Sequence, residues 1–232
     1  MNWLTRFGRR LRYGKLANAL DSVVCILVSL PGGNVASGTG FVIAPGLICS
    51  ARHVLRGAID VTVVTSTGES YTVKKGDITA SDDTDVAFID IFGLDLPPLE
   101  LFDSRDLAIR HKLYMASRAY DPRLKRSVLT LKDGRTTFTD TRDLSLEFYG
   151  MENITQRDGL ALSSHYAEKG DSGAPLLTAD GKVALMVTAY AESGQIGFPK
   201  SDRKLPMFQV TFNATINTIW QEAMLYGLVE AS

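Results

Sequence analysis

Hydrophobic positions along this chain come in short runs, each followed by residues that favour turns. Residues 23–30 are rich in β-branched side chains and are followed by Pro31-Gly32-Gly33, and residues 39–44 are followed by Pro45-Gly46. Short runs of this kind, bounded by Gly and Pro, are typical of strands. The first hundred residues therefore predict six strands: 23–30, 39–44, 47–50, 59–66, 70–74 and 86–91.

The second half of the chain repeats this pattern and then changes it. Asp133-Gly134 and Asp180-Gly181 are typical of tight hairpin turns between neighbouring strands. Ile216, Ile219 and Ala223 are spaced as on one face of a helix, so a C-terminal helix is expected. Eight runs before this helix predict strands: 112–116, 127–132, 135–139, 144–149, 160–163, 174–178, 183–189 and 207–210.

Two β-rich halves joined by a short linker predict an all-β protein made of two packed six-stranded β-barrels with a C-terminal helix. Closing each sheet into a barrel removes the exposed edges that isolated strands would leave. Residues 97–106, which contain two prolines and several charges, form the expected linker. The predicted organisation is a basic N-terminal leader at 1–20, a first barrel at 21–100 and a second barrel with the helix at 107–232, together one domain.

Composition and charge exclude several classes of protein. The chain has 232 residues and a net charge of −1, whereas a nucleic-acid-binding protein usually has a basic surplus, so no nucleic-acid partner is expected. No apolar stretch reaches the length of a membrane span. Cys25 and Cys49 are too few for a disulfide-dense scaffold, although the sequence leaves open whether they pair. Cys and His show no metal-ligand spacing, so no metal and no other cofactor is expected.

The N-terminal segment allows two interpretations. MNWLTRFGRRLRYGK carries five basic residues and is followed by LANALDSVVCILVSL, an order that resembles a signal peptide. However, Asp21 interrupts the apolar part, the small-residue cleavage site is poor, and residues 23–30 are needed as a strand. The favoured interpretation is a solvated or loosely packed N-terminal helix.

Residues 170–175 read GDSGAP and raise the question of why a serine stands between two glycines. Gly, Asp, Ser and Pro are all turn formers, so a plain β-turn is one interpretation. The other is a nucleophile on a tight loop whose backbone N–H groups face a developing oxyanion. The choice depends on whether the chain also supplies a base and an acid that orients it.

Two residues of the first half meet these requirements. His53, in Ser-Ala-Arg-His-Val, follows an apolar strand, and a general base belongs at the end of an element that faces a cleft. Asp85 opens the apolar run 86–89. It is either a plain surface cap of the strand or, if buried, a carboxylate that needs a partner such as an imidazole Nδ1–H. Asp82 and Asp83 precede a polar stretch and are interpreted as surface residues, so Asp85 is preferred.

With these residues in this order, the chain resembles the chymotrypsin/trypsin-like serine peptidases, in particular their compact bacterial and viral members. The resemblance rests on four motifs in order, over roughly residues 20 to 220: Gly-Thr-Gly-Phe-Val-Ile, Ser-Ala-Arg-His-Val, Asp-Val-Ala-Phe-Ile and Gly-Asp-Ser-Gly-Ala-Pro. It implies that Ser172 is the nucleophile, His53 the general base and Asp85 the residue that orients the base. It also implies an oxyanion hole formed by the backbone N–H groups of Gly170 and Ser172, and a protein or peptide substrate.

The chain departs from this family in two ways. Digestive relatives free an Ile-Val-Gly-Gly-type N-terminus that pairs with the acid before the nucleophile. No such segment precedes residue 23, so Asp171 has no obvious new amine to meet. We therefore expect a protease that needs no zymogen cleavage, or one that a regulatory partner switches on. The cysteine pair that usually flanks the base is also missing, since Val54 stands at the partner position for Cys49, which favours a reducing, cytoplasmic compartment.

By the same resemblance, the walls of the substrate pocket are expected near Tyr166, Thr188, Ala189 and Tyr190. No aspartate stands at the floor position near Tyr166, so cleavage after Lys or Arg is not indicated. Tyr190 either narrows the pocket for small apolar residues or is a packed surface aromatic. His165 is either a ligand for an acidic side chain or, as favoured here, a loop histidine.

Two other functions remain as alternatives to a protease. The double barrel could be catalytically latent or inactive and act as a partner-binding module, but the retention of His53, Asp85, Ser172 and Gly170 argues against this. An α/β-hydrolase esterase would place the serine first, in Gly-x-Ser-x-Gly, and the histidine last. The order in this chain is the reverse, and no helical pattern follows Ser172.

Overall fold

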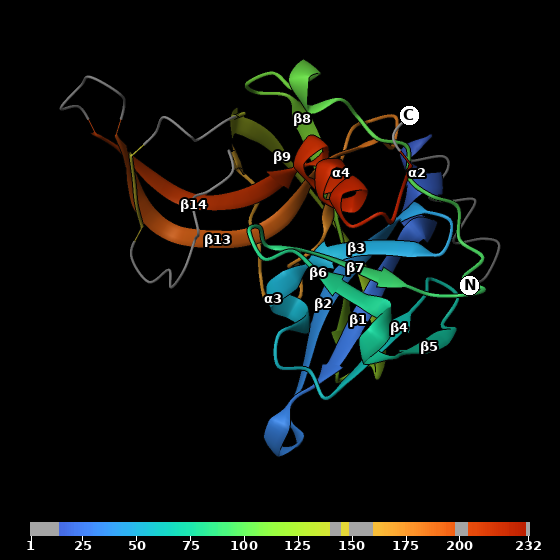
Figure 1. Cartoon of the computed structure of the whole chain (residues 1–232). Coiled ribbons are helices and arrows are strands. Elements are labelled where there is room, and N and C mark those ends of the chain that lie inside the picture. The colour runs from blue at the N-terminus through green and yellow to red at the C-terminus, as the bar shows by residue number, and fades with distance from the viewer. Residues whose placement is uncertain (1–13, 140–144, 149–159, 198–203, 231–232) are drawn as a thin grey trace.

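The computed structural model describes residues 14–139, 145–148, 160–197 and 204–230 and consists mainly of two antiparallel sheets (Figure 1). The first sheet has the strand order β5-β4-β1-β2-β3-β7-β6. Its seventh strand, β6, was not predicted, because three residues are too few to give a pattern. The strands of this sheet are β1 (Val23–Ser29), β2 (Val35–Ala44), β3 (Leu47–Ala51), β4 (Asp60–Val64), β5 (Ser70–Val73), β6 (Ile78–Ala80) and β7 (Val86–Asp90).

The second sheet closes on itself. Its strand order is β10-β13-β12-β8-β9-β11-β14, and β13 also pairs with β14, so six strands form a barrel and β10 lies on the free side of β13. These strands are β8 (Lys112–Asp121), β9 (Arg126–Phe138), β10 (Ser145–Phe148), β11 (Ala161–Ser163), β12 (Pro175–Leu177), β13 (Val183–Gly197) and β14 (Lys204–Thr215). The predicted trypsin-like double-barrel fold is confirmed, but only the second of the two expected six-stranded barrels closes: within the described residues no pairing joins β5 to β6, so the seven-stranded first sheet is a half-barrel. The boundaries proposed for the parts stay a prediction.

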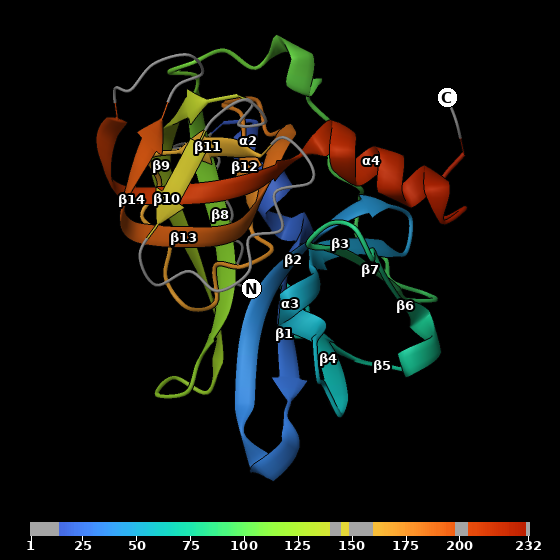
Figure 2. The ribbon, with the colours of Figure 1, turned by 60° about the vertical axis from the view of Figure 1, so that its left-hand side comes forward.

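The helices are short and lie at the ends of the sheets. The predicted C-terminal helix is α4 (Ile216–Leu225), which leaves β14 and lies beside β3 and β7 of the first sheet (Figure 2). In the described ranges, the other α-helices are α2 (Leu16–Ala19) and α3 (Arg52–Leu55). Single 3-10 turns occur at η1 (Leu20–Ser22), η2 (Pro31–Gly33), η3 (Lys75–Asp77) and η4 (Ser104–Asp106).

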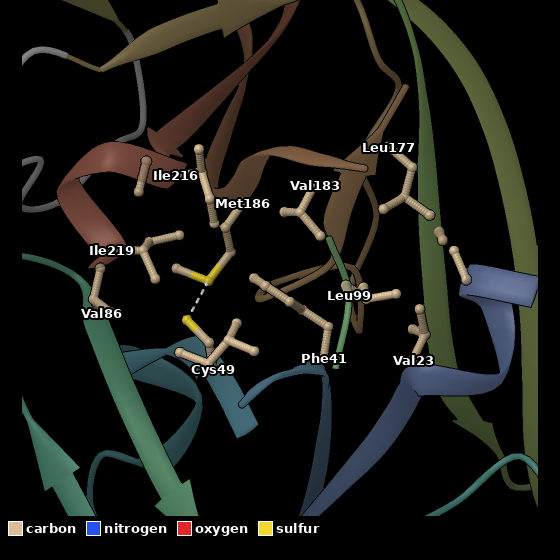
Figure 3. Close-up of a cluster of buried hydrophobic side chains, with 14 of the residues drawn as sticks. Val23, Phe41, Cys49, Val86, Leu99, Leu177, Val183, Met186, Ile216 and Ile219 are labelled. Carbon is tan, nitrogen blue, oxygen red and sulfur yellow. Dashed lines mark hydrogen bonds between the residues drawn. The ribbon is translucent and has the colours of Figure 1, made fainter. Parts of the chain in front are cut away.

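One hydrophobic cluster joins the two sheets and α4 (Figure 3). Phe41 and Cys49 of the first sheet are buried in it together with Met186 of β13 and Ile219 of α4. The thiol of Cys49 lies 3.6 Å from the sulfur of Met186. Because the interior is close-packed, this shared core fixes the position of one sheet relative to the other.

The expected hairpin at Asp133-Gly134 is wrong. β9 runs through these residues without a turn, and Gly134 pairs with Leu113 of β8. A Cβ on Gly134 would lie 2.7 Å from the ring of His165. The glycine is therefore explained by the close approach of a side chain to the strand rather than by a turn.

The description of the N-terminal helix as solvated or loosely packed is also wrong for the residues that the structure describes. Leu16 and Leu20 are each 1% exposed and belong to the cluster that joins the two sheets. A Cβ on Gly181, in the turn between β12 and β13, would lie 3.2 Å from the Cβ of Ala19. This segment therefore packs on the second barrel, while residues 1–13 of the predicted leader lie outside the described part.

Cys25 and Cys49 are both free and buried. Burial raises the pKa of the Cys25 thiol to about 12, against the opposing effect of Arg118, and burial also raises the pKa of Cys49. Both side chains therefore act as small hydrophobic core residues. The pairing that the sequence left open does not occur.

Candidate active site

His53 and Asp85 lie together because of the register of β3 and β7. These strands are antiparallel, with Ala51 opposite Val86, so the last residue of β3 lies beside the first residue of β7. His53 follows Ala51 by two residues, in α3, and Asp85 directly precedes Val86. The Oδ2 of Asp85 is 2.7 Å from the Nδ1 of His53, and its Oδ1 accepts a hydrogen bond of 2.9 Å from the backbone N–H of His53.

One carboxylate thus fixes both the backbone and the ring of His53. When Nδ1–H donates to Asp85, the neutral ring keeps its lone pair on Nε2, where it can accept a proton. The side chains of His53 and Asp85 are 46% and 33% exposed, so the ring is open to an incoming molecule. Among the described residues, no hydrogen bond joins His53 to the hydroxyl of Ser172.

The turn that carries Ser172 needs glycine at both ends. Gly170 has φ +99° and Gly173 has φ +82°, values that L side chains rarely adopt. A Cβ on Gly170 would lie 2.7 Å from the Cβ of Ala119. A Cβ on Gly173 would lie 2.1 Å from the carbonyl oxygen of Thr39. The two glycines are therefore required both by the backbone conformation and by the space around it.

Hydrogen bonds from Thr39 attach this turn to the first sheet. The backbone N–H of Thr39 donates to the carbonyl of Ser172 at 2.9 Å, and its hydroxyl donates to the carbonyl of Gly170 at 2.9 Å. The hydroxyl of Ser50 donates to the carbonyl of Thr39 at 2.7 Å. Since Ser50 and Ala51 lead directly into His53, the turn lies against the strand end that carries the histidine.

The backbone N–H groups of Gly170 and Ser172 donate to no acceptor in the part of the chain that the structure describes. Their neighbours are paired: Asp171 N–H donates to Glu168 at 3.0 Å and Gly173 N–H donates to Val187 at 2.8 Å. Two free N–H groups on a turn held in place by its neighbours can bind an anionic oxygen.

Asp171 does have an amine partner, the side chain of a lysine rather than a newly freed N-terminus. The Nζ of Lys132, on β9, lies 2.8 Å from the Oδ2 of Asp171 and 2.7 Å from the Oε2 of Glu168. Sequence reasoning missed Lys132 because it lies on β9, 39 residues before Asp171, and belongs to no motif. The only signal in the sequence was Asp171 itself, an acid beside Ser172 for which no local cation was evident.

The residues expected to line the pocket lie in two places. Thr188 is buried, its hydroxyl donates to the carbonyl of Phe212 at 3.1 Å, and the pairing of β13 with β14 shifts register around it. Ala189 is half-buried and Tyr190 is 41% exposed on the same strand. Tyr166, on the other side of the turn, is 53% exposed, and the Nζ of Lys132 lies 5.6 Å from the centre of its ring.

His165 has a structural position. It is 1% exposed, and its ring nitrogens lie 3.0 Å from the hydroxyl of Ser163 and 3.1 Å from the carbonyl of Leu113. Burial lowers the pKa of His165, which favours the neutral ring. A buried, neutral histidine with both nitrogens occupied is not a ligand for an acidic substrate, and it packs against β8 and β9 rather than lying in a loop open to solvent.

The described ranges contain no group of three or more His, Cys, Asp or Glu residues placed to bind a metal ion. Within the same ranges, no helix combines the length and the apolar character that a membrane crossing requires.

Comparison with known proteins agrees with this geometry. Residues 38–184, more than half of the chain, match the family described as trypsin-like peptidase domain. Curated protein sequences give no match. Among solved structures, the chain is similar to the Rv3671c protease from M. tuberculosis: the active form has 21% identity and a TM-score of 0.69, over 97% of this chain and 88% of that one. The inactive form has 20% identity and a TM-score of 0.66, over 94% of this chain and 95% of that one.

The chain is also similar to the HtrA-type protease AlgW with tripeptide, at 17% identity and a TM-score of 0.67, over 91% of this chain and 64% of that one. Identities this low show a shared fold and no more, so membership follows from the family match over residues 38–184. The chain belongs to the trypsin-like peptidase family of serine endopeptidases.

Proposed function

We propose that this protein cleaves peptide bonds by a Ser-His-Asp mechanism with an acyl-enzyme intermediate. Ser172 is the nucleophile, His53 the general base and acid, and Asp85 the residue that orients His53. The N–H groups of Gly170 and Ser172 form the oxyanion hole. The observation that carries this proposal is the contact of 2.7 Å between the Asp85 carboxylate and the Nδ1 of His53, at the strand end against which the Ser172 turn packs.

Each step uses a group whose position supports it. Nε2 of His53 takes the proton of the Ser172 hydroxyl as the oxygen attacks the substrate carbonyl, and Asp85 stabilises the imidazolium that forms. The carbonyl oxygen becomes an oxyanion, which accepts hydrogen bonds from the free N–H groups of Gly170 and Ser172. His53 then gives its proton to the leaving amine, and water hydrolyses the acyl-enzyme in a second round of the same steps.

The pocket favours substrates that are not basic at the cleaved residue. Tyr166, Thr188, Ala189 and Tyr190 place no carboxylate there, and the nearby Asp171 and Glu168 carboxylates are engaged by Lys132. We expect a protein or peptide substrate, with Tyr190 restricting the size of the side chain that enters. No zymogen cleavage is part of this proposal, and cytoplasmic location stays a prediction.

A fluorophosphonate probe tests the proposal, because it labels only a serine activated by its base and oxyanion hole. The folded wild-type protein should gain one probe mass, detected by intact-mass spectrometry, and Ser172→Ala should gain none. Ser164→Ala is a matched control, since its hydroxyl accepts a hydrogen bond from the backbone of Arg135 at 3.0 Å, outside the proposed machinery. Labelling at any residue other than Ser172 would contradict the proposal.

The second candidate is a latent double barrel that a partner protein activates or that only binds a partner. The lack of a hydrogen bond between His53 and the Ser172 hydroxyl favours it, although such contacts often tighten only when substrate binds. A folded wild-type protein that the probe does not label would favour this candidate over the protease.

A further inference from the structure

Asp171 is a buried carboxylate between Gly170 and Ser172, the two residues whose N–H groups form the proposed oxyanion hole. We infer that Lys132 is a positioning residue that holds the 170–173 turn in its oxyanion-binding conformation through its ion pair with Asp171. This inference rests on the proposed function and adds a residue from β9 to it.

The Asp171 carboxylate binds both a backbone N–H within its own turn and the side chain of Lys132. Its Oδ2 accepts hydrogen bonds of 2.8 Å from the Nζ of Lys132 and 2.8 Å from the backbone N–H of Glu168. The backbone N–H of Asp171 donates in return to the carbonyl of Glu168 at 3.0 Å. These bonds close a ring between residues 168 and 171, so the orientation of the next peptide groups, including the N–H of Ser172, depends on the carboxylate.

Such a carboxylate needs a cation in this position. The Asp171 side chain is 6% exposed, and a buried charge without a partner is strongly unfavourable. Without Lys132, the favourable response would be to rotate Asp171 toward water, which would break its bond to the Glu168 N–H. The same rotation would displace the N–H groups on either side of it.

Lys132 is built into the barrel wall, which makes it a rigid support. It lies on β9 opposite Met115 of β8, and its side chain is 19% exposed. Partial burial lowers the pKa of Lys132, but the hydrogen bonds to Asp171 and Glu168 outweigh this effect and leave it raised above the usual value, so the ammonium stays charged. The neighbouring Asp133 pairs with Lys112 instead. The titratable groups that act on Lys132 or lie against it are Asp171, Glu168, Tyr166 and His165.

As a consequence, the chain itself supplies the cation that orders the Ser172 turn. The ammonium that stabilises the acid before the serine comes from a side chain of the folded barrel, so the turn acquires its conformation when the barrel folds. A newly freed N-terminus is then not needed to order the site.

The test combines an activity readout with one that does not depend on activity. Lys132→Met removes the charge and keeps the length of the side chain, Lys132→Arg restores a charge, and Lys112→Met is the matched control. Lys112 also pairs with a carboxylate, 3.6 Å from Asp133, and its Nζ lies 5.0 Å from the centre of the Tyr114 ring. Its side chain is 46% exposed, and its partner is Asp133 rather than Asp171. The readouts are kcat and KM on one peptide substrate selected from a library, and hydrogen exchange of the amides of residues 168–173.

Lys132→Met should lower kcat about 100-fold, the loss typical of one oxyanion donor, with little change in KM. Lys132→Arg should recover most of this loss, and Lys112→Met should behave as the wild type. Amide exchange in residues 168–173 should be faster in Lys132→Met alone. A folded Lys132→Met variant with wild-type kcat and wild-type exchange would overturn the inference.

Two further outcomes are separated by the same experiment. If the wild type itself is inactive, the proposed function fails, and the exchange data decide the role of Lys132: unchanged exchange rejects it and faster exchange retains it. If Lys132→Met does not fold, Lys132→Gln replaces it, because the amide keeps a hydrogen-bond donor near Asp171 and removes only the charge. Wild-type kcat and exchange in Lys132→Gln would then reject a role for the charge.

Discussion

Replacing Gly173 by alanine tests whether the Ser172 turn is fixed by its contact with the first sheet. Gly173 has φ +82°, and an added Cβ would lie 2.1 Å from the carbonyl oxygen of Thr39, 2.5 Å from the Ser50 hydroxyl and 3.0 Å from the backbone nitrogen of Ala51. Two of these three atoms belong to the backbone of β2 and β3, so they cannot move without disturbing the sheet. The matched control is Gly68→Ala, in the turn between β4 and β5, where φ is +94° and nothing lies within 4 Å of the added Cβ.

The two variants share one cost and differ in the other. An alanine held at positive φ costs about 1–2 kcal/mol at either position. Overpacking adds about 1–3 kcal/mol at Gly173 alone. The free energy of unfolding should therefore fall by about 1–3 kcal/mol more in Gly173→Ala than in Gly68→Ala. For a chain of this size, each kcal/mol lowers the melting temperature by about 2–4 °C.

Urea unfolding followed by tryptophan fluorescence measures this difference, and fluorophosphonate labelling of the folded variants measures its effect on the site. Gly173→Ala should label more slowly than the wild type, because the turn must move away from Thr39 and takes Ser172 with it. Gly68→Ala should label at the wild-type rate. Equal losses of stability in the two variants, with equal labelling rates, would refute the reasoning that the contact with Thr39 fixes the position of Ser172.

Two other predictions follow from the site. Asp85→Asn should lower kcat by about 10⁴-fold, because the amide favours the wrong tautomer of His53. Asp82→Asn is the control, since the Asp82 side chain is 94% exposed. A loss of kcat below about tenfold in Asp85→Asn would exclude Asp85 as the orienting residue. The second concerns alkaline pH. Because the folded protein raises the pKa of Lys132, the contribution of its ion pair is fully present below the unfolded value of about 10.4 and is lost as pH rises through the folded value. The labelling rate of the wild type should therefore fall as pH rises through the raised pKa of Lys132 in the folded protein. The labelling rate of Lys132→Arg should persist to higher pH, since guanidinium stays protonated. Identical profiles for the two proteins would contradict an active role for the Lys132 charge.

Much of the fold could be predicted because its signals are local. Short apolar runs separated by Gly and Pro located most strands, and the spacing of Ile216 and Ile219 located α4. The limits of strands were less accessible. The predicted runs 183–189 and 207–210 are shorter than β13 and β14, which extend to Gly197 and begin at Lys204. Each strand continues by pairing with the other rather than by a pattern of its own.

The residues of the candidate site could be predicted from the sequence, but the contacts between them could not. His53, Asp85 and Ser172 stand in motifs whose chemistry is evident from residue type and order, and the family match supports that interpretation. Their contacts were not evident, since the bond between His53 and Asp85 depends on the register of β3 against β7. Thr39 and Ser50, which hold the turn, have nothing in the sequence that sets them apart from other strand residues.

The class of fold, the order of the chemical groups and the need for glycine beside Ser172 follow from the sequence alone. These features depend on hydrophobic period, residue chemistry and backbone conformation within a few residues. The partner of Asp171, the uninterrupted course of β9 through Asp133-Gly134 and the free state of Cys25 and Cys49 became evident from the three-dimensional fold. Each of these depends on a distant residue. The closed barrel brings Lys132 to Asp171 and His165 to Gly134, and the packing of the two sheets brings Met186 to Cys49. Such pairings are set by strand register and packing over the whole molecule, and no local stretch of sequence contains them.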